Sequence, residues 1–138
     1  MPYVEAILPA GMTPAKQPRG WIGVDFDGTL VNDEYRRDPD RCGAPIPRMV
    51  ERVKFWLSKG IEVRIVTGRV GIKANDDIIN RNSCTIQQFC LEQFGKPLPI
   101  TCSKDQEMIE LWDDRVVQVY SNTGKTVTLY NNNHEAKS

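Results

Sequence analysis

The stretch Val24-Asp25-Phe26-Asp27-Gly28-Thr29-Leu30 decides the fold of this chain. It continues the apolar run Trp21-Ile22-Gly23-Val24, which predicts a buried strand over residues 21–25. Asp25 and Asp27 lie two residues apart, so on an extended backbone their side chains point the same way. Two carboxylates at the end of a buried strand are costly to desolvate unless a cation or a hydrogen-bond donor meets them. The pattern therefore predicts a site for a hard divalent cation, for which Mg²⁺ is the best candidate.

A polar turn is the alternative interpretation of the same residues. Asp-x-Asp-Gly can form a turn in which the side chains bond the local backbone. An EF-hand loop fits poorly, because its glycine stands at the sixth position and Gly28 is the fourth residue from Asp25. The residues that follow the other strands decide between the two interpretations.

The remainder of the chain alternates between apolar and polar segments. Two helices are predicted: one over residues 45–59, which Gly60 ends, and one over residues 85–94, capped by Ser83. Further strands are predicted at 61–66, 100–102, 108–112 and 116–120, with residues 126–130 as a hairpin partner of the last. The polar segment 31–46 is a predicted loop, too short to be more than a small flap, and 70–82 is a predicted polar loop in which a helical turn is the alternative.

Strands that alternate with helices predict an α/β, Rossmann-like fold. We expect a parallel sheet of about five strands with helices on both faces, a possible small C-terminal hairpin and no large cap domain. Sites in such sheets form outside the carboxyl ends of the strands. Polar side chains follow four of the predicted strands, which supports one shared site; they are Asp25, Thr67, Lys104 and the pair Asp113-Asp114.

The 138 residues suit one domain, with residues 1–20 as an irregular arm, 21–130 as the domain and 131–138 as a flexible tail. The formal net charge is zero, with 18 basic and 18 acidic residues, which argues against a strongly cationic nucleic-acid binder. The chain has no apolar run long enough to cross a membrane and no secretory leader. We therefore expect a soluble cytoplasmic protein with no membrane partner; an oligomer is compatible with the sequence but is not indicated by it.

Four segments, in order, resemble the motifs of the haloacid dehalogenase (HAD) superfamily, whose members are mostly Mg²⁺-dependent phosphohydrolases. Asp25-Phe26-Asp27-Gly28-Thr29-Leu30 is similar to the first motif, and Ile65-Val66-Thr67-Gly68-Arg69 to the second. Lys104 resembles the third motif, a lone basic residue, and Trp112-Asp113-Asp114-Arg115 resembles the fourth. The resemblance covers about residues 20–120. It departs from the family at Lys104, which precedes only a short turn where the family often has a helix.

The resemblance implies a role for each matching residue. Asp25 attacks phosphorus and forms an aspartyl-phosphate, while Asp27 protonates the leaving oxygen and then activates water. Mg²⁺ is bound by Asp25, the backbone carbonyl of Asp27 and an acid from Asp113-Asp114, with the direct ligand of that pair left open. The phosphoryl group is bound by Thr67, Gly68, Arg69 and Lys104. Taken alone, Thr67 is an ordinary strand residue, and Arg69, Lys104 and Arg115 are solvated charges.

The expected activity is hydrolysis of a phosphate monoester by a HAD-type phosphatase. The substrate is a phosphorylated small molecule, or a nucleotide or nucleic-acid end, because Trp112-Asp113-Asp114-Arg115 also resembles the phosphatase domain of phage polynucleotide kinase. A non-catalytic HAD-like interaction module is the alternative of a different class.

Overall fold

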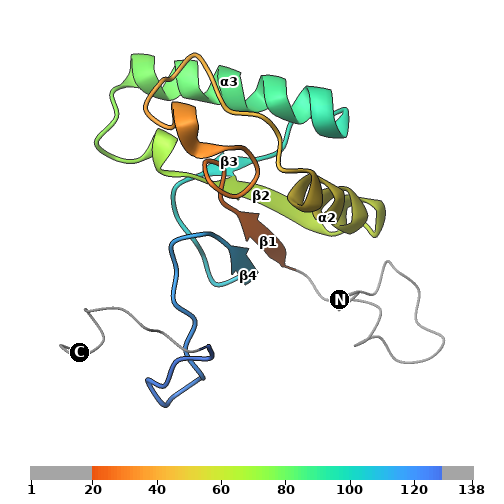
Figure 1. Cartoon of the computed structure of the whole chain (residues 1–138), viewed down its shortest axis with the longest axis vertical. Helices are drawn as coiled ribbons and strands as arrows, with labels where there is room; N and C mark the ends of the chain where they lie inside the picture. The colour runs from red at the N-terminus through yellow and green to blue at the C-terminus, as the bar shows by residue number, and fades with distance from the viewer. Residues whose placement is uncertain (1–19, 129–138) are drawn as a thin grey trace.

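The computed structural model describes residues 20–128, so the predicted tail and all of the predicted arm except Gly20 lie outside the described residues. Four parallel strands form one sheet in the order β3-β2-β1-β4 (Figure 1). Their bounds are β1 (Trp21–Val24), β2 (Glu62–Val66), β3 (Ile100–Thr101) and β4 (Met108–Trp112). This arrangement confirms the predicted α/β class and the parallel sheet.

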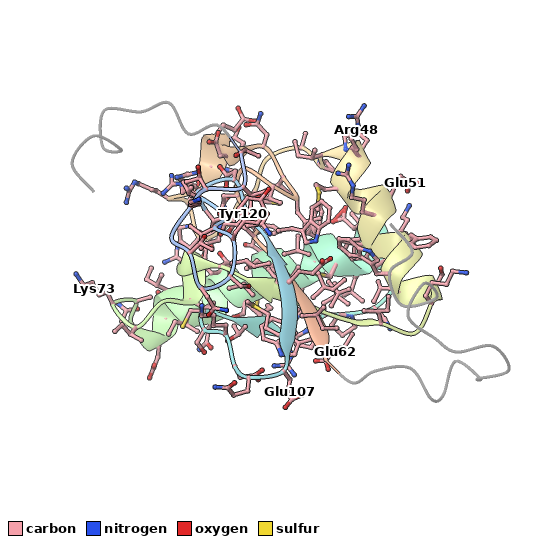
Figure 2. The ribbon with its side chains drawn as sticks, turned by 90° about the horizontal axis from the view of Figure 1, so that it is seen from below. Arg48, Glu51, Glu62, Lys73, Glu107 and Tyr120 are labelled. Carbon is pink, nitrogen blue, oxygen red and sulfur yellow. The ribbon has the colours of Figure 1, made fainter. Side chains whose placement is uncertain are left out.

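Strand β1 lies inside the sheet, where it pairs with β2 on one side and with β4 on the other, and all four of its residues are buried. Val24, its last residue, is in register with Ile65 of β2 and with Trp112 of β4. The carboxyl ends of these three strands therefore meet at one edge of the sheet. Figure 2 labels residues at the two ends of these strands. Glu62, which begins β2, and Glu107, which precedes β4, lie at the amino ends, and Tyr120 lies toward the carboxyl ends.

Within residues 20–128, two α-helices cover the sheet, α2 (Pro47–Ser58) and α3 (Asp76–Phe94). Their buried hydrophobic residues belong to a single core cluster that also contains Ile22, Val24, Val63 and Ile65. Because Ile22 pairs with Val63 and Val24 with Ile65, these four side chains share one face of the sheet. The expectation of helices on both faces is therefore wrong for residues 20–128. The chain moves in one direction along the sheet, from β1 to β2 and then to β3. Because such crossovers are right-handed, successive crossovers in one direction place their helices on the same face.

Helix α3 begins earlier than the sequence predicts. Residues 70–82 were expected to be a loop with Ser83 as the cap, but the helix starts at Asp76 and runs through Ser83. Asn75 caps it by accepting a hydrogen bond from Ile78 N, and two acids occupy the first turn, where the helix dipole favours them. Within the described residues, neither helix is both long and apolar enough to cross a membrane.

The predicted fifth strand over residues 116–120 does not join the sheet. Its half-exposed apolar residues Val116, Val117 and Val119 leave the sheet after β4, which remains an edge strand. Val119 forms an isolated antiparallel bridge with Thr126, supported by hydrogen bonds from Tyr120 N to Lys125 O and from Val127 N to Gln118 O. The predicted hairpin is thus present as one bridged turn, and residues 129–130 of it lie outside the described residues.

Candidate active site

The turn after β1 is built on the backbone carbonyl of Phe26. That oxygen accepts hydrogen bonds from the amides of Thr29, Leu30 and Val31 at 3.2, 2.9 and 3.1 Å. The Phe26 ring is fully buried and packs edge-to-face on Phe89 of α3, at 5.4 Å between ring centroids. Asp25 and Asp27, on either side of this anchored residue, are therefore held in place by the core.

Asp25 meets the two acids that follow β4. Carboxylate oxygens of Asp25, Asp113 and Asp114 all lie within 4.8 Å of one another. The backbone brings them together, because Asp25 N donates to Trp112 O at 2.8 Å. The Thr29 hydroxyl lies between them, 3.5 Å from an Asp25 oxygen and 3.4 Å from an Asp114 oxygen. We refer to Asp25, Asp113 and Asp114 as the acid cluster.

The acid cluster carries negative charge that the surrounding protein does not neutralise. Burial raises the pKa of Asp25 from 3.8 to about 7, and the hydrogen bond with Asp114 and the charge of Asp113 add to the rise. Burial and the charge of Asp114 also raise the pKa of Asp113. Among residues 20–128, no lysine or arginine forms an ion pair with any of the three.

These observations fit a hard divalent cation. Three carboxylates at this spacing are the oxygen ligands that Mg²⁺ prefers, and a cation removes the repulsion that raises the pKa of Asp25. Within the described chain, no hydrogen bond reaches the Asp27 carbonyl oxygen, which leaves this predicted ligand available as well. The side chain of Asp27 is not part of the cluster.

Gly28 allows the turn to approach Asp114 closely. Its φ of +86° lies in the region that L side chains rarely adopt, and a Cβ atom there would be 2.5 Å from Asp114 Oδ2. Two structural features therefore favour glycine at position 28: the left-handed backbone and the close approach to Asp114 of the acid cluster.

Thr67 follows β2 at the same edge of the sheet and is buried. Its Oγ1 accepts a hydrogen bond from Arg69 N at 3.1 Å, which caps the short 3₁₀ helix η3 (Gly68–Val70). The accepting role leaves the hydroxyl hydrogen free to donate to a ligand. Thr67 and Gly68 both line the pocket that contains Asp25.

Arg69 forms a buried bidentate ion pair with Asp27. Its Nε donates to Asp27 Oδ2 at 2.7 Å and its Nη2 to Oδ1 at 2.9 Å, and the two side chains are 3% and 9% exposed. Asp25 and Asp27 thus line the same pocket but contact different partners. Arg69 is not a solvated charge, and its guanidinium already has partners within the protein.

Arg69 also fastens the flap, residues 31–46, to the rest of the domain. Its guanidinium donates to the backbone carbonyls of Tyr35, Asp38 and Arg41 at 2.9, 2.8 and 3.0 Å. Asn82 of α3 completes the network by accepting from Arg69 Nη1 and donating to the Arg69 carbonyl. The sequence predicts that Arg69 contacts phosphate. In the structure, Arg69 instead holds Asp27 and the flap together.

Lys104 does not join the other motif residues. It is exposed, does not line the pocket and, among residues 20–128, forms no ion pair with Asp25. Its neighbour Asp105 accepts a hydrogen bond from Trp21 Nε1, at the opposite end of β1 from Asp25. Without a helix after β3, the chain returns directly to the start of β4 and takes this loop away from the site.

Arginines supply the positive charge in the pocket instead. The pocket has a volume of about 350 Å³, and its lining includes Arg36, Arg37 and Arg115 beside the aspartates. Arg36 and Arg37 follow η2 (Asp33–Tyr35) on the flap, and the sequence analysis missed both. The signal that could have found them is a basic doublet in a loop that begins directly after the first motif.

Comparisons with known proteins add little to this geometry. No family model matches the chain, and no curated protein matches it significantly. The structure of a conserved protein from Bacteroides thetaiotaomicron is similar, with 20% sequence identity and a TM-score of 0.48 over 72% of this chain and 79% of that one. A likeness of this size carries no argument about function, so the function must be argued from the site itself.

Proposed function

We propose that this chain is a Mg²⁺-dependent phosphatase that hydrolyses a phosphate monoester at the carboxyl edge of a Rossmann-like sheet. The observation that carries the proposal is that Asp25 and Asp113 of the acid cluster line one pocket with Thr67, while Asp114 lies against the other two acids. These groups come from the ends of three strands, which is where parallel α/β folds bind ligands. The four-motif resemblance to the HAD superfamily supports the same activity.

Asp25 is the proposed nucleophile. One of its carboxylate oxygens attacks phosphorus, the bond from phosphorus to the leaving oxygen breaks, and an aspartyl-phosphate forms. Asp25, Asp113, Asp114 and the Asp27 carbonyl would hold Mg²⁺, whose charge offsets the repulsion between the carboxylate and the phosphate dianion. Thr67 donates its hydroxyl hydrogen to a phosphoryl oxygen, and Gly68, the next residue, also lines the pocket.

Asp27 is the proposed general acid and base. In the first step it gives a proton to the departing oxygen; in the second it takes a proton from the water that attacks phosphorus, which releases Asp25 and inorganic phosphate. Both of its oxygens accept hydrogen bonds from Arg69, so one of these contacts must open and Asp27 must take up a proton from water or from the substrate before it acts as the acid. Lys104 is left out of the proposed catalytic set because of its position.

The arginines around the pocket favour a strongly anionic substrate, such as a nucleotide or a nucleic-acid end, over a weakly charged metabolite. A non-catalytic interaction module is the second candidate, and the displacement of Lys104 is the observation that favours it. The two candidates differ in turnover, since only the phosphatase breaks a bond.

The experiment is hydrolysis of a generic aryl phosphate with Mg²⁺, with a chelator and with Asp25→Asn. Asp76→Asn is the matched control, because Asp76 is an exposed acid in the first turn of α3 and does not line the pocket. We expect metal-dependent turnover that Asp25→Asn abolishes and Asp76→Asn preserves. Equal turnover by the wild type and Asp25→Asn contradicts the proposal.

A further inference from the structure

We infer that Arg37 and Arg115 bind the phosphoryl group in this pocket and take the role that the sequence assigns to Lys104. The inference rests on the proposed function for the identity of the anion. Its structural basis is the set of arginines that line the pocket, together with the negative charge of the acid cluster that they face.

The guanidinium groups of Arg37 and Arg115 are available to bind a ligand. Arg69 is already held by Asp27 and four other oxygens, and Arg36 has an Asp33 oxygen at 3.4 Å. In the part of the chain that the structure describes, the side chains of Arg37 and Arg115 form no hydrogen bond or ion pair. Both are exposed and both line the pocket.

The flap backbone around Arg37 is held in place by hydrogen bonds. The Arg69 guanidinium binds the carbonyls of Tyr35 and Asp38, which lie on either side of the doublet Arg36-Arg37. Arg115 is fixed independently, because its amide donates to Asp113 Oδ1 at 2.8 Å in the turn after β4. Two arginines from separate segments thus reach one pocket from held positions, which lowers the cost of ordering them on a ligand.

The charge balance of the pocket also favours a role for the arginines. The three carboxylates of the acid cluster and a divalent cation leave one negative charge, and a phosphate dianion brings the total to three. Arg37 and Arg115 carry two positive charges that no carboxylate of residues 20–128 pairs with, whereas Asp33 already offsets the charge of Arg36, and Lys104 does not line the pocket. Guanidinium groups also match phosphate oxygens with paired donors, which an ammonium group cannot do. The arginines therefore replace the lysine in charge and improve on it in geometry.

The test compares Arg37→Ala, Arg115→Ala and Lys104→Ala in the full chain, with inorganic phosphate as the probe in the presence of Mg²⁺. Arg48→Ala is the matched control, since Arg48 is an exposed arginine at the start of α2, outside the pocket (Figure 2). Calorimetric titration measures phosphate affinity, and aryl phosphate hydrolysis is measured on the same samples. Far-ultraviolet circular dichroism confirms that each variant is folded.

We expect Arg37→Ala and Arg115→Ala each to weaken phosphate binding roughly tenfold to a hundredfold, as for the loss of a hydrogen bond to a charged group. Lys104→Ala is expected to lose less than either, Arg48→Ala to match the wild type, and Arg37→Lys to recover only part of the affinity. If Lys104→Ala loses more affinity than the arginine variants, or if the folded wild type binds no phosphate, the inference is overturned. If the arginine variants weaken phosphate binding while the wild type hydrolyses nothing, the inference stands and the proposed function fails.

Discussion

Replacing Arg69 with methionine is expected to destabilise the domain by roughly 3–5 kcal/mol, because it leaves a buried carboxylate without its counter-charge. The guanidinium and the Asp27 carboxylate are 3% and 9% exposed and are joined at 2.7 and 2.9 Å. Methionine keeps most of the volume of the arginine stem, so the loss reports charge and hydrogen bonding more than packing. A loss of this size is a large part of the roughly 5–15 kcal/mol that stabilises a typical domain.

The assay is urea unfolding of the full chain, and Arg81→Met provides the matched control. Arg81 pairs with Asp40 at 2.6 Å, as short a contact as the buried one, but the two side chains are 43% and 59% exposed. An exposed pair contributes about 0–1 kcal/mol, so the control is expected to lose little. Arg81 also pairs with Asp77 at 3.2 Å, so the control removes two exposed ion pairs where Arg69→Met removes one buried pair.

A second consequence separates the ion pair from the flap contacts. Arg69→Met also removes the donors to three flap carbonyls, so amide hydrogen exchange over residues 35–41 is expected to accelerate. Adding Asp27→Asn to Arg69→Met is expected to recover stability, since no charge is then buried without a partner. A loss below about 1 kcal/mol for Arg69→Met, equal to that of Arg81→Met, would refute the reasoning.

Three further predictions concern the acid cluster and α3. With chelator present, stability is expected to fall as the pH rises from about 4 to 7, because the folded state holds the Asp25 proton, with a pKa of about 7, longer than the unfolded state does. The raised pKa corresponds to roughly 4 kcal/mol, or about 2 kcal/mol after allowance for the partial exposure of Asp25, and thermal unfolding should show Mg²⁺ stabilising most above pH 7. Gly28→Ala is expected to weaken Mg²⁺ binding in calorimetry and to cost more than about 1 kcal/mol, since it has a φ of +86° and would meet Asp114. Asn75→Ala is expected to cost about 1 kcal/mol in urea unfolding, whereas Ser83→Ala, which is within the helix, should cost less.

The parts of the site that the sequence predicts correctly depend on local pattern. Asp25 and Thr67 follow apolar runs that must be buried, and a parallel sheet brings the ends of those runs to one edge. The acidic pair after β4 is close to Asp25 for the same reason. The strand-end pattern therefore predicts that Asp25 lies near the acidic pair, although the same argument also places Lys104 there.

The parts that fail depend on contacts between distant segments. Arg69 and Asp27 are 42 residues apart, and nothing next to either residue indicates that they pair. Lys104 lies in a loop whose course is set by the direct return from β3 to β4, so its place in the motif order does not fix its place in space. Residues 76–82 are polar enough to be mistaken for a loop, but they are the first turns of a helix whose cap is Asn75, and Asn82 is buried beside Arg69.

The most direct test of the proposed mechanism is to capture the phosphoryl group on Asp25. The wild type is acid-quenched during turnover of an aryl phosphate with Mg²⁺, digested with protease, and examined by mass spectrometry. A phosphate adduct is predicted on the peptide that contains Asp25, lost with chelator and absent from Asp25→Asn. Sustained turnover with no adduct at Asp25, and with activity retained in Asp25→Asn, would contradict the account.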